Sequence, residues 1–115
     1  MSNKLIGDWG ERTAENFLQE HGYRIMERNY RYSRGEIDLI VEKEGLLIFV
    51  EVKTRSSHKF GFPEEAIDDN KQKWILKVAD HYIHQVNWEE GIRFDIISIL
   101  RGVKTEILHI QDAFY

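Results

Sequence analysis

The sequence contains no cysteine, no segment resembling a signal peptide, and no apolar run long enough to cross a bilayer. Without cysteine the chain can form neither disulfide bonds nor thiolate metal sites, which favours a reducing compartment. The stretch from Met1 to Glu11 lacks the apolar core of a signal peptide, and the longest apolar run extends only from Leu46 to Val50. We therefore expect a cytoplasmic protein with no membrane partner.

An excess of basic residues is also missing, because 20 Asp and Glu outnumber 16 Lys and Arg and give a formal net charge of −4. Proteins that bind nucleic acid indiscriminately usually carry a basic excess, so the bulk charge argues mildly against that class. The basic residues nevertheless cluster in two short stretches, which contain Arg24, Arg28, Arg31 and Arg34, and then Lys53, Arg55 and Lys59. A local basic surface on an acidic protein is compatible with this distribution.

The composition indicates one globular domain. The chain has 115 residues, the usual size of a single domain, and its 42% hydrophobic and 31% charged residues are enough to build a core and a solvated surface. No repeat, low-complexity segment or Pro/Ser-rich linker interrupts it. Residues 1–115 are therefore predicted to form one domain.

Hydrophobic periodicity predicts the order helix, three strands, helix, two strands. The first helix is expected at Asn3–Glu20, and the second from Pro63 to about Gln85, with proline at the first helical position, where it is tolerated. The buried stripe of the second helix is expected to contain Ile67, Trp74, Ile75, Val78 and Tyr82. The strands are expected at Tyr23–Tyr32, Glu36–Glu42, Leu46–Lys53, Ile92–Leu100 and Thr105–Ile110. This order indicates an α/β or α+β sheet with helices packed on it.

Two acids and a lysine occupy the predicted hairpin of the second and third strands. Side chains alternate faces along a strand, so Glu51 and Lys53 point to the same side. If Glu44-Gly45 forms a two-residue turn, Asp38 comes opposite Glu51 with Cβ atoms roughly 5 Å apart, whereas a three-residue turn shifts the pairing by one. Two such carboxylates are costly in apolar strands unless a cation such as Mg²⁺ joins them. The alternative is that Lys53 only forms an ion pair with one of these acids.

The helices add further candidates. Lys71 lies four residues after Ile67 and four before Ile75, so it falls on the buried stripe of the second helix. There it could meet the carboxylates or a phosphate. The alternative is that its amine reaches solvent. Glu11 could approach the same site from the first helix, or remain solvated. Two kinds of residue are weaker candidates. His81 and His84 are three positions apart on the second helix but lack an evident third metal ligand. The three tryptophans are interpreted as packing residues: Trp9, Trp74 and Trp88.

An ordered set of motifs extends from the first helix to beyond the second. It comprises Gly10-Glu11, Arg28-Asn29-Tyr30-Arg31, Gly35-Glu36-Ile37-Asp38-Leu39-Ile40, Phe49-Val50-Glu51-Val52-Lys53-Thr54-Arg55, Phe60-Gly61-Phe62-Pro63, Glu65-Ala66, Lys71 and Arg93-Phe94-Asp95. This set resembles the PD-(D/E)xK nuclease superfamily, in particular its Holliday-junction resolvase branch, and more narrowly the bacterial YraN-like family. The resemblance implies an α/β fold with a restriction-endonuclease-like mixed central sheet flanked by helices.

The same resemblance implies roles for individual residues. A divalent metal, Mg²⁺ or Mn²⁺, is expected at Asp38 and Glu51, with the backbone carbonyl of Val52 as a further ligand. Lys53 is expected to assist the attacking water, and Glu11 to help hold the metal or its water. These roles correspond to a metal-dependent endonuclease.

The expected substrate is DNA, with branched or damaged structures as the candidate forms. Phosphate contacts are expected from Arg31, Arg34, Arg55 and Lys71. Resolvase-like nucleases commonly act as dimers, so a homodimer is expected as well, and the loop Ser56–Phe62 is expected to be mobile without substrate. The alternative function is a non-catalytic module that binds nucleic acid or protein and retains the nuclease fold.

Overall fold

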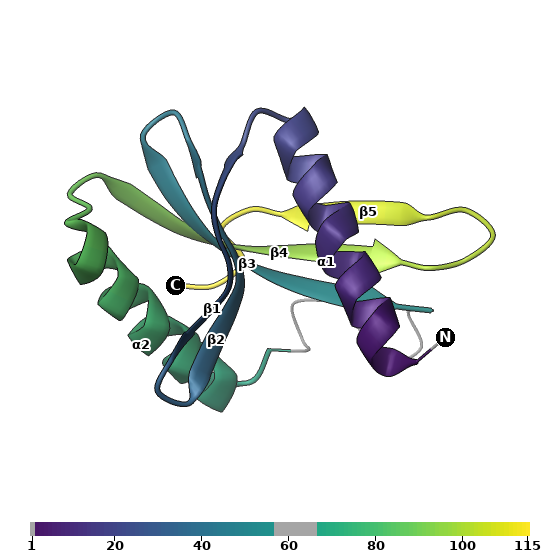
Figure 1. The fold of residues 1–115 in the computed structure, drawn as a ribbon, viewed down its shortest axis with the longest axis horizontal. Coiled ribbons are helices and arrows are strands. Elements are labelled where there is room, and N and C mark those ends of the chain that lie inside the picture. The colour runs from purple at the N-terminus through teal and green to yellow at the C-terminus, as the bar shows by residue number, and fades with distance from the viewer. Residues whose placement is uncertain (1, 57–66) are drawn as a thin grey trace.

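The computed structural model describes residues 2–56 and 67–115, which form a five-stranded mixed sheet and two helices (Figure 1). Along the chain the elements are α1 (Asn3–Glu20), β1 (Arg24–Tyr32), β2 (Gly35–Lys43), β3 (Leu46–Arg55), α2 (Asp69–Val86), β4 (Gly91–Leu100) and β5 (Glu106–Ile110). The predicted α/β class, with a mixed central sheet flanked by helices, is confirmed.

The sheet has its strands in sequential order, β1-β2-β3-β4-β5. Only β3 and β4 are parallel, and α2 lies in the connection between them, as a parallel crossover requires. Glu44 and Gly45 both have positive φ, 52° and 79°, which is the geometry of a two-residue hairpin turn. Lys43 consequently pairs with Leu46, so the two-residue alternative is confirmed and the three-residue one is wrong.

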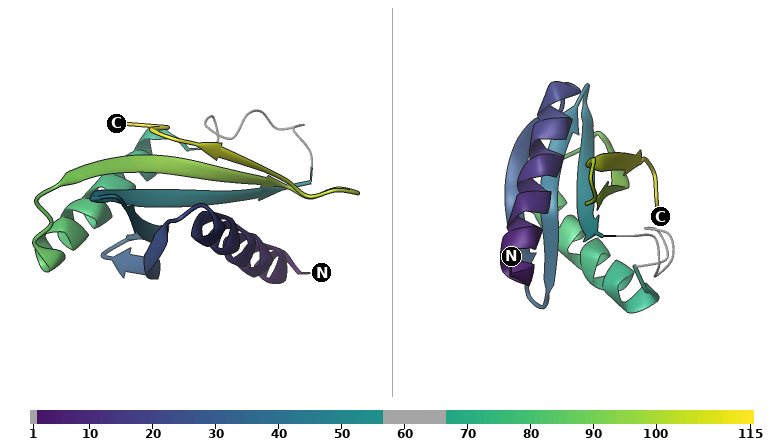
Figure 2. Two further views of the ribbon diagram at one scale, coloured as in Figure 1. Left: turned by 90° about the horizontal axis from the view of Figure 1, so that it is seen from above. Right: turned by 90° about the vertical axis from the view of Figure 1, so that its right-hand side faces the viewer.

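The two helices cover opposite faces of the sheet, as the views in Figure 2 show. One core cluster packs α2 against the sheet and includes Ile40, Phe49, Ile96, Ile75 and Val78. The other packs α1 against the sheet and includes Val41, Val50, Ile97, Ala14 and Leu18. Neighbouring positions of β2, β3 and β4 thus face different helices, which explains why these strands are almost continuously apolar.

The first helix has the predicted bounds, but α2 begins later than expected. Within the described residues it starts at Asp69, and the side chain of Asp68 accepts a hydrogen bond from the backbone N–H of Lys71 as the N-cap. Ile67 therefore precedes the helix rather than lying on its stripe, although it is only 4% exposed. The expected start at Pro63 and residues 57–62 of the predicted loop lie outside the described residues. No helix within residues 2–56 or 67–115 is long and apolar enough to span a membrane.

A glycine sets the distance between the β1–β2 hairpin and α2. A Cβ atom at Gly35 would lie 2.5 Å from Cγ2 of Val78 and 3.0 Å from the carbonyl oxygen of Trp74. Any larger residue would push the helix away from the start of β2. This close approach places the first turns of α2 next to the polar half of β2.

A buried polar cluster connects the last two strands of the sheet, β4 and β5. Asp95 on β4 is fully buried and accepts two 2.8 Å hydrogen bonds from the guanidinium of Arg93 and one of 2.7 Å from Nε2 of His109. The backbone N–H of Asp112 donates to the same carboxylate at 3.0 Å. The cluster therefore connects β4, β5 and the segment after β5 through one side chain.

Candidate active site

The site lies where β2 and β3 separate. Their pairing extends from Lys43 and Leu46 to Leu39 and Val50, and Asp38 and Glu51 are the next residues in this register. Beyond that point the two strands diverge, with the β1–β2 hairpin leaving the line of β3 in Figure 1. The backbone N–H of Val52 donates instead to a carboxylate oxygen of Asp38 at 2.8 Å. A side chain thus takes the place of the next strand-to-strand hydrogen bond.

Glu51 is the most buried acid of the site, with 6% exposure, and two lysines approach the same carboxylate oxygen. Nζ of Lys71 lies 2.7 Å from Oε1 of Glu51, and Nζ of Lys53 lies 3.6 Å from it. Lys71 comes from α2, and its approach to an acid of the hairpin agrees with its predicted place on the helix. The ion pair between Lys53 and Glu51, expected in the alternative interpretation, is also present.

Asp38 and Glu51 lie at the junction of two hollows. One, of about 340 Å³, is on the α1 side and is also lined by Glu11 and Val52. The other, of about 370 Å³, is on the α2 side, and its lining includes Arg34, Glu36, Asp68, Lys71 and Trp74. The predicted set of Glu11, Asp38, Glu51, Val52 and Lys71 is therefore brought together between the two helices.

The ionised forms of Asp38 and Glu11 are disfavoured by their surroundings. Burial, and then the negative charge of Glu51, raise the pKa of Asp38 to about 8, although the hydrogen bond from Val52 opposes this. Burial also raises the pKa of Glu11, with the nearby charge of Glu36 adding to the effect and a hydrogen bond with Asp38 reducing it. A cation placed between these carboxylates would relieve both effects.

The two lysines differ in their electrostatics. Burial lowers the pKa of Lys53, and the neighbouring amine of Lys71 lowers it further. Burial acts in the same direction on Lys71, but its hydrogen bond and charge interaction with Glu51 prevail and raise its pKa. Lys71 therefore keeps its positive charge more firmly, and Lys53 is the amine that loses its proton more readily.

The donor set fits a hard divalent cation. Two carboxylates and a backbone carbonyl are oxygen ligands of the kind that Mg²⁺ and Mn²⁺ prefer, and water or phosphate oxygens usually complete the shell. No group of three His, Asp or Glu side chains in the described ranges 2–56 and 67–115 is arranged to hold a metal by itself. His81 and His84 accordingly have no third ligand there. Besides the two carboxylates, a metal at this site would therefore need the backbone carbonyl and oxygens of water or phosphate.

The other predicted phosphate contacts are spread around this site. Arg34 lines the α2-side hollow. Arg31 is largely exposed and forms a 3.5 Å ion pair with Glu36, whereas Arg55 is half-buried where β3 ends. Arg34 is therefore the predicted arginine that shares a hollow with Asp38 and Glu51.

Several site residues were not predicted from the sequence. Glu36 and Asp68 line the α2-side hollow, as does Trp74, which was interpreted as a packing residue on the buried stripe. With its amide nitrogen turned toward the acids, Asn29 donates to both Glu11 and Glu36 at 3.1 Å. Asn29 belongs to the Arg28-Asn29-Tyr30-Arg31 motif, which could have marked it as a candidate. Periodicity, however, cannot show which polar residue of a strand faces a site.

Substitution of Lys71 tests whether its charge compensates Glu51. We expect Lys71→Met to lower the free energy of unfolding by about 1–2 kcal/mol in EDTA, because a largely buried carboxylate loses its nearest cation while the lysine itself is 39% exposed on its side chain. Urea denaturation at pH 7 measures this change. Lys73→Met, an exposed position on the same helix, is the matched control and should leave stability within about 0.5 kcal/mol. Equal stabilities of the two variants would show that Glu51 does not need Lys71 as a partner.

Comparison with known proteins shows similarity over nearly the whole chain. The model of an uncharacterised protein family, UPF0102, matches residues 10–99. A UPF0102 protein of Clostridioides difficile strain 630 is 46% identical, and the match covers 99% of this chain and 100% of that protein. A UPF0102 protein of Natranaerobius thermophilus is 49% identical, with the same two coverages.

One solved structure has a more distant similarity. It is that of SfsA from Pyrococcus furiosus in complex with Ca²⁺, which is 17% identical and superposes with a TM-score of 0.38. The match covers 96% of this chain but 64% of that one, so this chain spans less than two thirds of that protein.

Proposed function

The chain belongs to the UPF0102 family, the YraN-like group, and on that premise we propose that it is a divalent-metal-dependent endonuclease that hydrolyses phosphodiester bonds in DNA. The observation that carries this proposal is the convergence of Asp38, Glu51 and Lys53 where β2 and β3 separate. Two acids and an amine next to an open hollow are the groups that metal-assisted phosphodiester hydrolysis requires.

Asp38, Glu51 and the carbonyl of Val52 are the proposed ligands of Mg²⁺ or Mn²⁺. The raised pKa of Asp38 supports this assignment, because burial beside Glu51 disfavours the ionised carboxylate and a bound cation would stabilise that form. A bound divalent ion supplies polarisation of the phosphate and of the attacking water. Glu11 is proposed to orient that water, which its contacts with Asp38 and Asn29 support.

The lysines have complementary proposed roles. The lowered pKa of Lys53 favours an uncharged amine, which can accept a proton from water as the water oxygen attacks phosphorus and the bond to the leaving sugar oxygen breaks. Lys71, with its raised pKa, remains charged and can stabilise the additional negative charge on the phosphate. Each role follows from the electrostatics of that amine.

Arg31, Arg34 and Arg55 are proposed to contact phosphates at a distance from the cut. Such contacts position DNA without reading its sequence. The resolvase-like motifs favour branched or damaged DNA as the substrate and a homodimer that cuts two equivalent strands. The lack of cysteine favours the cytoplasm as the location.

A cleavage assay tests the proposed activity directly. Four-way junction, flap, single-stranded and duplex DNA are incubated with the protein in Mg²⁺, Mn²⁺ or EDTA, and products are separated by denaturing electrophoresis. We expect cleavage of at least one substrate with metal and none in EDTA. Lys53→Met should lower the rate roughly 100- to 10,000-fold, because proton transfer by a positioned group contributes on this order. Lys73→Met is the control, and absence of metal-dependent cleavage from every substrate would contradict the proposal.

The net charge of −4 favours one alternative, a non-catalytic module that binds nucleic acid or protein through the retained fold. Titration calorimetry separates the two functions. A nuclease is expected to bind Mn²⁺ in the presence of DNA and to lose this binding in Glu51→Gln. Binding of DNA without any binding of divalent metal would favour the module.

A further inference from the structure

One side of α2 carries alternating basic and aromatic residues that lead away from the acids. Lys71, Trp74, Lys77 and His81 are spaced by three, three and four positions, so each lies about one helical turn beyond the last on the same side. Nζ of Lys77 lies 4.6 Å from the centre of the Trp74 ring. Trp74 lines the α2-side hollow together with Asp38 and Glu51, so this row begins at the candidate active site.

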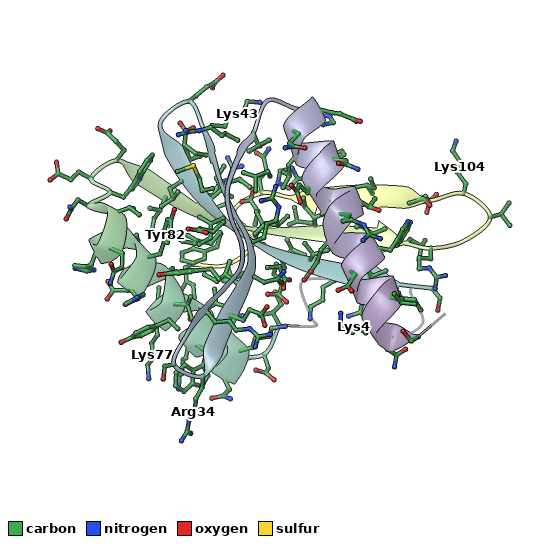
Figure 3. All side chains as sticks on the ribbon, viewed as in Figure 1. Lys4, Arg34, Lys43, Lys77, Tyr82 and Lys104 are labelled. Carbon is green, nitrogen blue, oxygen red and sulfur yellow. The ribbon has the colours of Figure 1, made fainter. Side chains whose placement is uncertain are left out.

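The end of the β1–β2 hairpin supplies the opposite wall. The ring of Tyr32 stacks on His81 with centroids 3.8 Å apart and planes 10° from parallel, yet Tyr32 remains 42% exposed. Arg34, two residues later, lines the α2-side hollow. A third hollow of about 410 Å³, here called the Tyr32 hollow, is lined by Tyr32, Lys77, Asp80, His81 and His84. Arg34 and Lys77 lie at one end of the molecule in Figure 3, and Lys104 lies at the opposite side.

We propose that this surface, formed by Tyr32, Arg34, Trp74, Lys77 and His81 and here called the stacking track, binds an unpaired DNA strand next to the cutting site. The proposal deepens the proposed endonuclease function and rests on it. In a duplex the base faces are covered by neighbouring pairs, whereas a single strand can place bases on aromatic rings and phosphates on nearby cations. The substrate class is therefore DNA with a single-stranded segment that adjoins the cut.

Geometry and charge both favour this occupant. Tyr32 and His81 are already stacked, so the exposed ring is fixed in orientation before a base arrives, which lowers the entropic cost of binding. Two basic side chains, Arg34 and Lys77, flank the aromatic rings. Asp80 is the one acid among the described residues that line the Tyr32 hollow. Away from the acids of the α2-side hollow, the local charge thus suits a polyanion although the whole chain is acidic.

Binding of short labelled oligonucleotides tests the track apart from cleavage. Fluorescence anisotropy in EDTA compares a 12-nucleotide single strand, an abasic strand of the same length and a blunt duplex. We expect wild type to prefer the base-containing strand to both others. Tyr32→Ala should weaken binding of that strand about tenfold and leave the abasic strand unchanged, whereas Tyr32→Phe keeps the ring and retains affinity.

Further variants separate stacking from charge. Lys77→Ala should weaken binding of the base-containing and abasic strands alike, roughly two- to fivefold, because it removes a phosphate contact. Lys104→Ala, at the opposite side of the molecule, is the matched control and should leave both affinities unchanged. In addition, the base-containing strand should quench tryptophan emission in wild type and not in Trp74→Phe, in which Trp9 and Trp88 remain.

The results distinguish this inference from the proposed function. Equal affinity of wild type for base-containing and abasic strands, including no binding of either, would overturn the track. So would an unchanged affinity of Tyr32→Ala with a melting temperature equal to that of wild type. If strand binding depends on Tyr32 but no substrate is cleaved with any metal, the endonuclease proposal fails while the track remains.

Discussion

Asp38→Asn is expected to lower metal-dependent cleavage of DNA at least about a hundredfold and, at the same time, to raise the stability of the metal-free protein. The amide keeps an oxygen that can accept the hydrogen bond from Val52, so the local structure is retained. It removes one of two anionic ligands and, with it, much of the affinity for a divalent cation. It also removes a buried charge next to Glu51, which is unfavourable when no cation is present.

The gain in stability should depend on pH in a defined direction. The pKa of Asp38 is raised to about 8 in the folded protein, whereas an unfolded Asp titrates near about 4. Between these values the folded state binds more protons than the unfolded state, so the contribution of Asp38 to the free energy of unfolding decreases as pH rises from about 4 to about 8. The difference between Asp38→Asn and wild type should thus grow over this range, reaching on the order of a few kcal/mol at pH 9.

Urea denaturation in EDTA at pH 5, 7 and 9 measures this difference, and the cleavage assay measures the loss of activity. Asp80→Asn, at an exposed position of α2, is the control, and its stability should follow that of wild type at each pH. A constant difference between Asp38→Asn and wild type across the three pH values would contradict the assigned electrostatics. Cleavage by Asp38→Asn at the wild-type rate would contradict the active site.

Asp95→Ala is expected to lower the free energy of unfolding by about 3–5 kcal/mol, the largest loss of stability expected from one substitution here. The change removes the acceptor for Arg93, His109 and the backbone N–H of Asp112 at once. The guanidinium of Arg93, with a side chain only 20% exposed, is then left without its carboxylate. A single deletion therefore leaves several polar groups without partners.

The pH dependence of this loss has the opposite sign to that of Asp38. Burial alone would raise the pKa of Asp95, but hydrogen bonds from His109 and Arg93 outweigh it and hold the pKa below its ordinary value. The stability contributed by Asp95 is present above the unfolded pKa of about 4 and is lost as pH falls through the lower folded value. Urea denaturation at pH 7 and at pH 3 should show the difference from wild type narrowing at pH 3.

Glu89→Ala, in the exposed turn after α2, is the control for Asp95→Ala and should change stability by less than about 0.5 kcal/mol. A loss below about 1 kcal/mol for Asp95→Ala would mean that solvent replaces the carboxylate as the acceptor for the three donors without cost. The cluster would then not hold β4, β5 and the following segment together.

The alternation of apolar residues was sufficient to predict most of the elements. The first helix has the predicted bounds. Ile6, Gly10, Ala14 and Phe17 recur at helical spacing, and of these Gly10 and Ala14 are among the buried residues of the helix, together with Leu18. The sequence left two hairpin registers open, and the structure has the one set by a two-residue Glu44-Gly45 turn, which fixes every later pair of β2 and β3. The start of α2 was predicted too early, because the single proline was taken as the first helical residue, whereas the described helix begins after the N-cap Asp68.

The composition of the site was only partly accessible in the same way. Strand parity placed Glu51 and Lys53 on one face, and helical spacing brought Lys71 to the buried side of α2. Neither pattern could place Trp74 at the hollow, because its exposure depends on where Gly35 lets the hairpin approach the helix.

The sequence by itself determined the local features of this protein: which segments are helix or strand, which side chains share a face, and which two registers were open to the central hairpin. These features arise from contacts between residues that are close along the chain or are tied by a short turn. Only the tertiary structure decided that Glu11 of α1 and Lys71 of α2 meet the hairpin acids from opposite faces of the sheet, because that depends on where β2 and β3 separate. It likewise decided that Tyr32 stacks on His81, since packing between distant segments leaves no periodic signal in the chain.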